Sequence, residues 1–344
     1  MALWDPIETE EALEDNLSAP TQGAIEAMSR LRGGLILLGA GGKMGPSLAW
    51  MAKRASDAGG VSRRIIAVAR FSNPEAEELL NAKGVETIRC DLLDEEAVAR
   101  LPRVPNVIFM TGMKFGSTEN PGAAWAMNTY APGVAARHYA DSRIAAFSTG
   151  NVYPLTPVQR GGSLETDAPE PKGEYAMSAL GRERIFEYFS REHGVPTAIM
   201  RLNYACELRY GVLADIAQKV WTGQPIDVTM GYVNVIWQSG ANAMALQSLE
   251  RAASPPFVIN IAGKPVVSVR ELAQRFGELM EKPVEITGEE APDALLSDAS
   301  KAYEQFGPPE VEREQMLAWV AHWTMKGGRT LGKPTHFEVR SGKF

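Results

Sequence analysis

Three glycines, Gly39, Gly42 and Gly45, stand three residues apart where an apolar run, 35–38, gives way to a longer apolar stretch. In a G-x-x-G-x-x-G pattern the first glycine permits a tight turn, the second lets backbone amides approach a pyrophosphate, and the third allows close helix packing. A helix beginning here directs its free N–H groups and positive end at the anion. The pattern predicts a dinucleotide site, with a ligand-free structural turn as the alternative. The residues expected to form it are Gly39, Gly42, Lys43, Met44 and Gly45.

The residue that ends the second predicted strand bears on the choice of dinucleotide. NAD sites commonly carry an acidic residue there, which accepts hydrogen bonds from the ribose hydroxyls. This chain has Arg70 instead, whose guanidinium suits a 2′-phosphate, and Lys43 adds charge in the glycine loop. We expect NADP in preference to NAD, the alternative being that both cations are surface residues. Asp91 is placed either to accept from the adenine amino group or to cap the helix near Asp94.

Short apolar segments alternate with amphipathic helical patterns between residues 35 and 203. The expected strands are 35–39, 64–69, 85–89, 106–111, 143–149 and 197–202, and the expected helices are 44–57, 74–82, 94–101, 122–140 and 174–193. Strands this apolar, separated by helices, are typical of a parallel sheet covered on both faces. The fold class is therefore expected to be α/β, with a Rossmann-type doubly wound parallel sheet.

The order of the predicted strands and helices divides the chain into four expected regions. A helical extension, 1–32, precedes a dinucleotide-binding domain, 33–203; a smaller α/β substrate-binding region, 204–330, can return strands to the main sheet, and a tail, 331–344, follows. Helical patterns in the smaller region fall at 211–223, 240–252, 268–280 and 311–325.

Composition excludes several classes of protein. Of 344 residues, 45% are hydrophobic and 22% charged, which is ordinary for a globular protein. A net charge of -7 without a long basic run argues against nucleic-acid binding. No apolar run reaches the roughly 20 residues that span a bilayer, and the acidic start is unlike a signal peptide. With two cysteines, Cys90 and Cys206, a disulfide framework is not expected, and we expect a cytoplasmic protein without a metal site.

Seven segments, taken in order and spacing, resemble a known family. They are GAGGKMG (39–45), CDLLD (90–94), MNTYAPG (127–133), FSTGNVYP (147–154), EYAMSALGRE (174–183), RLNYAC (201–206) and VINIAGKPVVSVRELA (258–273). From about residue 33 to about residue 325 the chain is similar to the extended short-chain dehydrogenase/reductases of the NAD(P)-dependent epimerase/dehydratase type. The resemblance implies further cofactor contacts from Leu92, Thr111 and Gly112, and a homodimer formed through helices 122–140 and 174–193.

The same resemblance implies the acid/base chemistry. Tyr175 takes the position of the family's acid/base tyrosine, and Thr149, with Ser148 beside it, that of the hydroxyl which binds the reacting oxygen. Hydride transfer to or from a carbon that bears oxygen requires a proton to move at that oxygen. An ordinary phenol is a poor base at neutral pH, so the family adds a lysine one helical turn later to favour the phenolate.

That lysine is absent, because Ala179 stands at its position. Three cations are conceivable substitutes: Arg182, two turns along the same helix; Lys172, just upstream; and Lys114, in the loop after the fourth strand. We favour Lys114 because ligands bind at the carboxyl edge of such sheets. The alternatives are that all three are solvated surface charges or that Tyr175 is not catalytic.

The substrate region departs from the nucleotide-sugar pattern. The dehydratases carry an Asp-Glu pair after the hydroxyl residue, whereas this chain has Gly150-Asn151. The segment 231–243 lacks the arginine that nucleotide-sugar enzymes use to hold a diphosphate. We expect a small carbohydrate-like substrate contacted by Asn151, Asn203 and Trp237, although Trp237 suits core packing equally well.

Two functions remain open on these observations. The first is an NAD(P)-dependent oxidoreductase or epimerase acting on a hydroxyl or ketone, with Tyr175 as acid/base and Thr149 as hydrogen-bond partner. The second is a non-catalytic NAD(P)-binding sensor or regulator that has lost the lysine, which Ala179 favours. Fold alone does not decide between them.

Overall fold

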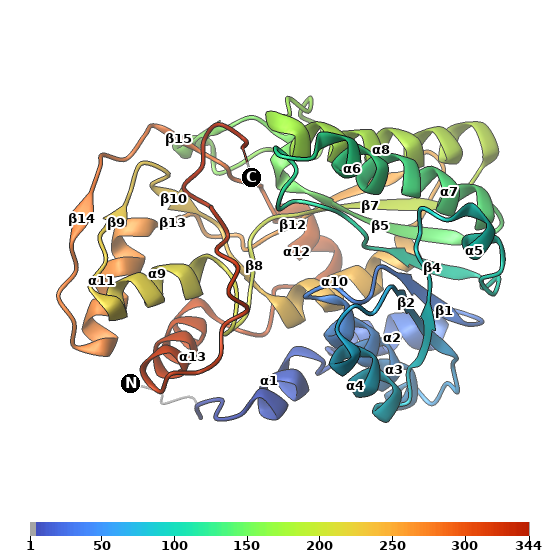
Figure 1. The fold of residues 1–344 in the computed structure, drawn as a ribbon, viewed down its shortest axis with the longest axis horizontal. Coiled ribbons are helices and arrows are strands. Elements are labelled where there is room, and N and C mark those ends of the chain that lie inside the picture. Colours follow the sequence, from blue (N-terminus) through green and yellow to red (C-terminus); the bar gives the residue numbers. More distant parts are fainter. Residues whose placement is uncertain (1–4, 344) are drawn as a thin grey trace.

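The computed structural model describes residues 5–343 and contains a seven-stranded parallel sheet. The strand order is β12-β7-β5-β4-β1-β2-β3 (Figure 1). The strands are β1 (Leu35–Leu38), β2 (Ile65–Ala69), β3 (Glu86–Arg89), β4 (Asn106–Phe109), β5 (Arg143–Thr149), β7 (Thr197–Leu202) and β12 (Phe257–Ile261). The doubly wound α/β fold is confirmed. β12 comes from the region after residue 203 and pairs with β7 in the main sheet.

Helices cover both faces of this sheet. Apolar side chains of α2 (Gln22–Arg30), α3 (Gly45–Ala58) and α10 (Gln238–Ser248) share one core with alternate strand residues such as Leu35 and Leu37. Ile36 and Leu38 face the opposite core, with α5 (Glu95–Ala99), α7 (Ala131–His138) and α8 (Gly173–His193). Alternate residues of a strand point to opposite faces, which explains why β1 is apolar throughout. α4 (Pro74–Ala82) precedes β3, and α12 (Ser300–Phe306) lies near β12.

The prediction of a single helix over 122–140 is wrong for the middle of that range. The chain forms α6 (Pro121–Trp125), a π-helical turn (Ala126–Tyr130) and then α7. Pro132 has no N–H, so the carbonyl of Asn128 lacks its ordinary helical donor. The Nε of Arg182 donates to that carbonyl at 3.4 Å. The π-helical turn is therefore hydrogen-bonded to α8 through Arg182. Turns of this kind frequently occur at functional sites.

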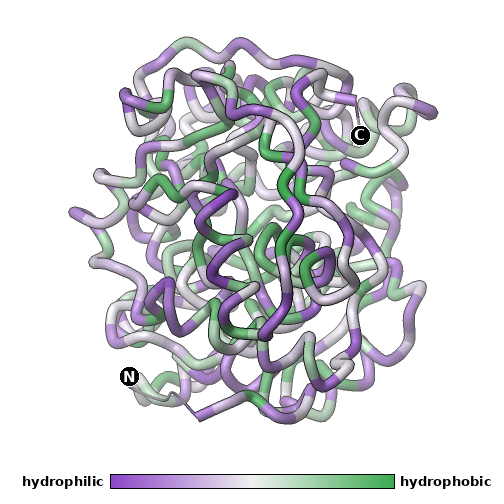
Figure 2. Tube along the Cα trace, turned by 90° about the vertical axis from the view of Figure 1, so that its left-hand side faces the viewer, coloured by the Kyte–Doolittle hydropathy of each residue, from purple (hydrophilic) through white to green (hydrophobic). Residues whose placement is uncertain are grey.

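A second lobe has its own core and lies on the left of Figure 1. Its helices are α9 (Val212–Thr222), α11 (Val269–Met280) and α13 (Arg313–Met325). Its short strand pairs are β8 (Ala205–Cys206) with β11 (Ile236–Trp237), β9 (Ile226–Asp227) with β14 (Ile286–Thr287), β10 (Tyr232–Val233) with β13 (Val267–Ser268), and β6 (Thr156–Pro157) with β15 (Asp293–Ala294). In Figure 2, hydrophilic residues recur along the outermost loops.

Both terminal segments contribute to the core of the second lobe. Leu13 and Leu17 of α1 (Glu10–Leu17) and Phe337 of the last segment are buried in it. Residues 326–343, which follow α13, form no regular element, and Figure 1 shows this segment in red, running between the two lobes. Within residues 5–343 no helix is both long and apolar enough to cross a membrane. In the same range, no group of three or more His, Cys, Asp or Glu side chains is arranged to hold a metal ion.

Candidate active site between the two lobes

A cavity of about 1030 Å³ brings together side chains from the sheet edge, the second lobe and both terminal segments. The wall includes the glycine loop, the ends of β4, β5 and β7, and Tyr175 and Arg182 of α8. It is completed by Arg209 and Tyr210, by α1, and by residues 329–333. Its position beyond the carboxyl ends of parallel strands is where open α/β sheets bind ligands.

The three glycines differ in what requires them. Gly39 has a φ of +96°, and a Cβ on it would lie 2.2 Å from Oγ1 of Thr111. A Cβ on Gly45 would lie 2.2 Å from the carbonyl oxygen of Ala40. A Cβ on Gly42 would meet only the Gly39 carbonyl oxygen, at 3.7 Å. The fold therefore requires Gly39 and Gly45. A Cβ on Gly42 would enter open space, which a ligand can occupy.

Two further features fit a dinucleotide. Met44 is the N-cap residue of α3 and makes no side-chain capping hydrogen bond, which leaves helix N–H groups to bind an anion. Oγ1 of Thr111 is buried and has no hydrogen-bond partner among the described residues, as expected of a group whose partner is a ligand. The cavity wall includes Gly39, Gly42, Lys43, Met44 and Gly112, but not Gly45, Arg70, Asp91, Leu92 or Thr111.

Gly42→Ala is expected to weaken NADPH binding about tenfold and to leave stability unchanged, because the added methyl enters open space that the pyrophosphate needs. Gly45→Ala is the contrasting variant, expected to cost about 1–3 kcal/mol of unfolding free energy because its methyl collides with backbone. Fluorescence titration and denaturant unfolding measure the two effects. Unchanged NADPH affinity in Gly42→Ala would contradict the assignment of the loop.

Lys43 does not join Arg70. Its Nζ donates to the carbonyl of Ala205 at 3.2 Å and lies 3.8 Å from the ring centroid of Tyr210, both in the second lobe. Burial lowers the pKa of Lys43 to about 8. Arg70 is exposed at the end of β2. The expectation that both cations serve one 2′-phosphate is therefore corrected, and Arg70 alone keeps that role as a prediction.

Asp91 does not cap the helix that follows it. Its Oδ1 accepts from the backbone N–H of Leu93 at 3.0 Å, while Asp94 caps α5 by accepting from Ala97 N. Leu92, which follows Asp91, is buried.

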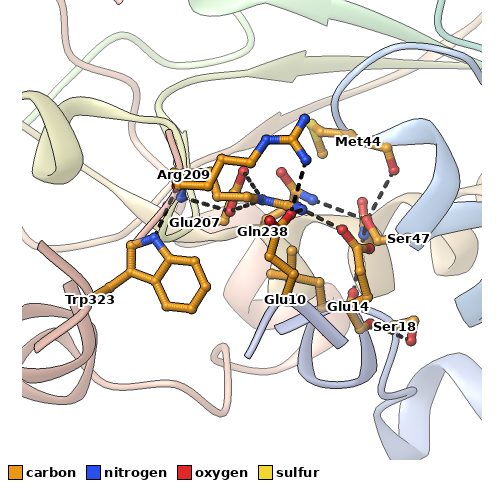
Figure 3. Close-up of polar contacts among 12 residues, drawn as sticks. Glu10, Glu14, Ser18, Met44, Ser47, Glu207, Arg209, Gln238 and Trp323 are labelled. Carbon is orange, nitrogen blue, oxygen red and sulfur yellow. Dashed lines mark hydrogen bonds and ion pairs between the residues drawn. The ribbon is translucent and has the colours of Figure 1, made fainter. Parts of the chain in front are cut away.

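Arg209 is held by three carboxylates, so it is not available to bind an anion (Figure 3). Its guanidinium lies 2.6 Å from Glu14, 3.3 Å from Glu10 and 3.2 Å from Glu207. Burial raises the pKa of Glu207 and the charge of Arg209 opposes that rise. These contacts clamp α1 to the cavity rim. No local pattern in the sequence indicated that Glu10 and Glu14 would meet a residue about 200 positions away.

Tyr175 and Ser148 line the cavity together, whereas Thr149, next to Ser148 in sequence, is outside the cavity wall. The hydroxyl of Ser148 donates to Glu183 at 2.5 Å, and Glu183 forms a buried ion pair with Arg201 at 2.7 Å. Oγ1 of Thr149 accepts from the backbone and side-chain nitrogens of Asn151, at 3.2 and 3.0 Å. The hydroxyl hydrogen of Ser148 is thus engaged by a carboxylate, whereas the oxygen of Thr149 accepts both of these bonds and its own hydroxyl hydrogen is not used in them.

The position of the missing lysine is filled by apolar packing. Ala179 is fully buried against Val152 and Tyr153. Arg182 is buried on the same helix and lines the cavity; it donates to the carbonyl of Phe147 and to Oδ1 of Asn128, both at 2.8 Å. Burial lowers the pKa of Arg182, and the nearby phenol of Tyr175 opposes that change. A Cβ on Gly112 would lie 2.6 Å from Nη2 of Arg182, so glycine there makes room for the guanidinium.

The other two cations considered as substitutes have different surroundings. Nζ of Lys114 donates to the carbonyl of Thr335 at 3.0 Å. Burial and the charge of Lys43 lower the pKa of Lys114 to about 8. Lys172 is exposed and precedes α8. Arg182 lies near the phenol of Tyr175, and Lys114 lines the same cavity, so both stay candidates for the missing positive charge.

Two expected substrate contacts point into the protein instead. Trp237 is fully buried, packs against Trp319 at 5.4 Å and donates to Asn16 at 2.8 Å. Asn203 is buried and donates to Asn234 and to the carbonyl of Leu295. Both residues hold the second lobe together rather than lining the cavity. Asn151 also lies outside the cavity wall, bonded to Thr149.

Comparisons with known proteins agree with this architecture. A model of the NAD dependent epimerase/dehydratase family matches residues 35–223. A UDP-glucose 4-epimerase from Thermotoga maritima, solved with UDP-glucose, is 19% identical with a TM-score of 0.69, and the match covers 86% of this chain and 99% of that one. A dTDP-glucose 4,6-dehydratase from Streptomyces venezuelae, solved with NAD, is 16% identical with a TM-score of 0.72, over 85% and 97%. The search of curated proteins returned no match.

Proposed function

Because this chain belongs to the NAD dependent epimerase/dehydratase family, we propose that it is an NAD(P)-dependent oxidoreductase or epimerase acting on a hydroxyl or ketone of a small carbohydrate-like substrate. The observation that carries the proposal is one cavity whose wall holds both the glycine loop and Tyr175. Phosphate-binding amides and a phenol facing the same space are what hydride transfer at an oxygen-bearing carbon requires.

The glycine loop holds the cofactor in this proposal. The amides around Gly42 and the start of α3 bind the pyrophosphate, and Thr111 supplies a hydroxyl at the edge of the loop. The bound nicotinamide supplies or accepts the hydride. Residues of α1 and of the segment 329–333 form the part of the cavity wall contributed by the two ends of the chain.

Tyr175 moves the proton at the reacting oxygen. Thr149 still has its O–H to donate, so it can hold that oxygen while Tyr175 gives or takes the proton. Ser148 carries its Glu183 hydrogen bond, which fixes the end of β5 beside the cavity. Arg182 provides the positive charge near the phenol that Ala179 does not.

The cofactor is proposed to be NADP. The solved relatives described above include an NAD complex, whereas the end of β2 here carries the exposed Arg70 rather than an acid. The purified protein is expected to bind NADPH about tenfold more tightly than NADH, because a guanidinium pairs strongly with a 2′-phosphate. Arg70→Ser should remove this preference by weakening NADPH alone. A wild-type preference for NADH, measured by fluorescence titration, would contradict the role of Arg70.

The substrate and the assembly are proposed on separate grounds. Gly150 and Asn151 leave no acid/base pair for dehydration, so redox chemistry or epimerisation is favoured over loss of water. Exposed aromatic and Met side chains favour a homodimer through the helices that carry them, since large exposed apolar patches mark interfaces. These side chains are Trp125, Tyr130, Met177 and Tyr188.

A non-catalytic NAD(P)-binding role is the second candidate, and Ala179 is the observation that favours it. A sensor needs the glycine loop and the cavity but no acid/base group. A turnover assay distinguishes the two proposals. An enzyme would oxidise NADPH in the presence of a member of a panel of small keto and aldehyde carbohydrates. A sensor would bind NADPH without turnover.

A further inference from the structure

The segment after α13, residues 326–343, forms a strap that crosses from one lobe to the other (Figure 1). It begins against α13, where Nε1 of Trp323 donates to the carbonyl of Arg329 at 3.0 Å. Leu331 then donates its N–H to the carbonyl of Arg209 at 3.0 Å. The strap therefore enters the cleft directly beside the clamp that holds α1.

The middle of the strap is fixed to the second lobe. Both the N–H and the hydroxyl of Thr335 donate to Asp215 of α9, at 2.8 and 2.6 Å. Phe337 is buried in the core of that lobe. Glu338 forms an ion pair with Lys219, also on α9. The buried ring of Phe337 is thus flanked by two contacts to α9, one through Asp215 and one through Glu338. The strap is therefore part of the fold rather than a loose tail.

The same segment also touches the first lobe. Nζ of Lys114 donates to the carbonyl of Thr335, and the ring of Phe115 lies 6.3 Å from that of His336. Farther along, a Cβ on Gly173 would lie 2.0 Å from the carbonyl oxygen of Gly342. Gly173 is two residues before Tyr175, so the strap passes close to the start of the helix that carries the acid/base group.

Between these anchor points the strap forms part of the cavity wall. Arg329, Leu331 and Lys333 line the cavity opposite the glycine loop and Tyr175. Arg340, beyond them, donates to the carbonyl of Asp293 at 3.0 Å, so the strap also contacts β15. The family match ends at residue 223, and the strap lies outside it.

We propose that this strap sets the substrate class: it occupies the path along the second lobe that a nucleotide would take, so the enzyme accepts a small carbohydrate without a nucleotide moiety. The inference rests on the proposed function, because it places the reacting sugar at Tyr175 and the dinucleotide on the glycine loop. Arg209 and Tyr210, which precede α9, continue the cavity wall from Tyr175 into the second lobe, so a nucleotide joined to a sugar at Tyr175 would extend toward α9. That surface is already in contact with Thr335, Phe337 and Glu338.

The size of the cavity agrees with this assignment. A single small-molecule site occupies about 300–1,000 Å³, and the whole cavity here is about 1030 Å³. It therefore holds a dinucleotide with a small second molecule more readily than two nucleotide-sized ligands.

The test measures binding of UMP and UDP-glucose to the full chain saturated with NADPH, by isothermal titration calorimetry. Phe337→Ala combined with Arg340→Ala removes the buried anchor and the Asp293 contact, which loosens the strap. Ser341→Ala, at an exposed position of the same strap, is the matched control. The loosened variant is expected to bind UMP and UDP-glucose at least tenfold more tightly than the wild type and the control, with similar affinities for NADPH.

A cleavable chain guards against misfolding of the double variant. A protease site inserted at Gly332, which is exposed and has no atom within 4 Å of a built Cβ, allows the protein to fold before it is cut. Cleavage should produce the same gain in UMP affinity. Wild-type binding of UDP-glucose as tight as that of the loosened variant would overturn the inference, and so would a lack of gain in both altered proteins. If the wild type binds no NADPH but the gain persists without cofactor, the proposed function fails and the strap assignment stands.

Discussion

Tyr175→Phe is expected to lower kcat about 10²–10⁴-fold, the usual contribution of a positioned general acid or base. The substitution removes one oxygen and keeps the ring, so the packing of α8 should change little. Because the phenol faces the same cavity as the glycine loop, NADPH affinity should stay within about threefold, an effect well under 1.4 kcal/mol. Initial rates of NADPH oxidation, using the panel compound that the wild type turns over, measure the effect.

Tyr210→Phe is the matched control for this experiment. Tyr210 also lines the cavity, and Lys43 lies over its ring rather than on its hydroxyl. Burial raises the pKa of Tyr210 above the ordinary phenol value, which makes its hydroxyl harder to ionise at neutral pH. Turnover in this variant should be close to that of the wild type. Loss of activity in Tyr210→Phe with retention in Tyr175→Phe would move the proton-transfer role to Tyr210.

The sheet could be predicted because its signal is local. Each central strand is a short apolar run, since both of its faces are buried, and β1 shows this at all four positions. The glycine loop was also predictable, because backbone sterics at Gly39 and Gly45 fix those residues whatever the rest of the chain does. The π turn had a local signal in Pro132, which removes a helical hydrogen bond, but helical periodicity alone does not register it.

The cavity wall was less predictable because long-range contacts decide where charged side chains go. Lys43 follows a glycine in a phosphate-binding loop, yet its ammonium lies across the cleft at Ala205. The local sequence places Glu10 and Glu14 on the solvated face of a helix, but both form ion pairs with Arg209 of the second lobe. Trp237 suited a pocket and the core equally well from sequence, and its hydrogen bond to Asn16 accompanies its burial in the core.

Arg182 lies two helical turns from Tyr175, and we propose that its charge replaces that of the missing lysine. Helical side chains lean toward the N-terminus of the helix, and seven residues at 1.5 Å each place Arg182 about 10 Å along the axis from Tyr175. A long side chain directed back along the helix covers much of that span. Asn128 and the Phe147 carbonyl hold the guanidinium in this direction through the π turn and β5. Lys114, favoured from the sequence because its loop lies at the carboxyl edge of the sheet, lines the same cavity and stays the alternative source of this charge.

Arg182→Gln is therefore expected to lower kcat about 10²-fold, comparable to loss of one preorganised electrostatic group. It should also destabilise the fold by about 1–3 kcal/mol, because Asn128 and Phe147 lose a buried donor. Arg184→Gln, which changes an exposed arginine of the same helix, should alter neither quantity. If Arg182 were only structural, kcat measured on the folded fraction would be unchanged. Initial rates and denaturant unfolding separate the two effects.

Restoring the lysine tests the same positive charge from its usual position in the family. Ala179→Lys alone should not raise activity, because the new side chain enters a fully buried site against Val152 and places a second cation one turn from Arg182. Combined with Arg182→Gln, the cation repulsion disappears, and part of the lost kcat should return. Such rescue would establish that the site needs one positive charge near the phenol of Tyr175, supplied here from position 182. Turnover that appears only in chains carrying Lys at position 179 would instead support the non-catalytic role for the natural protein.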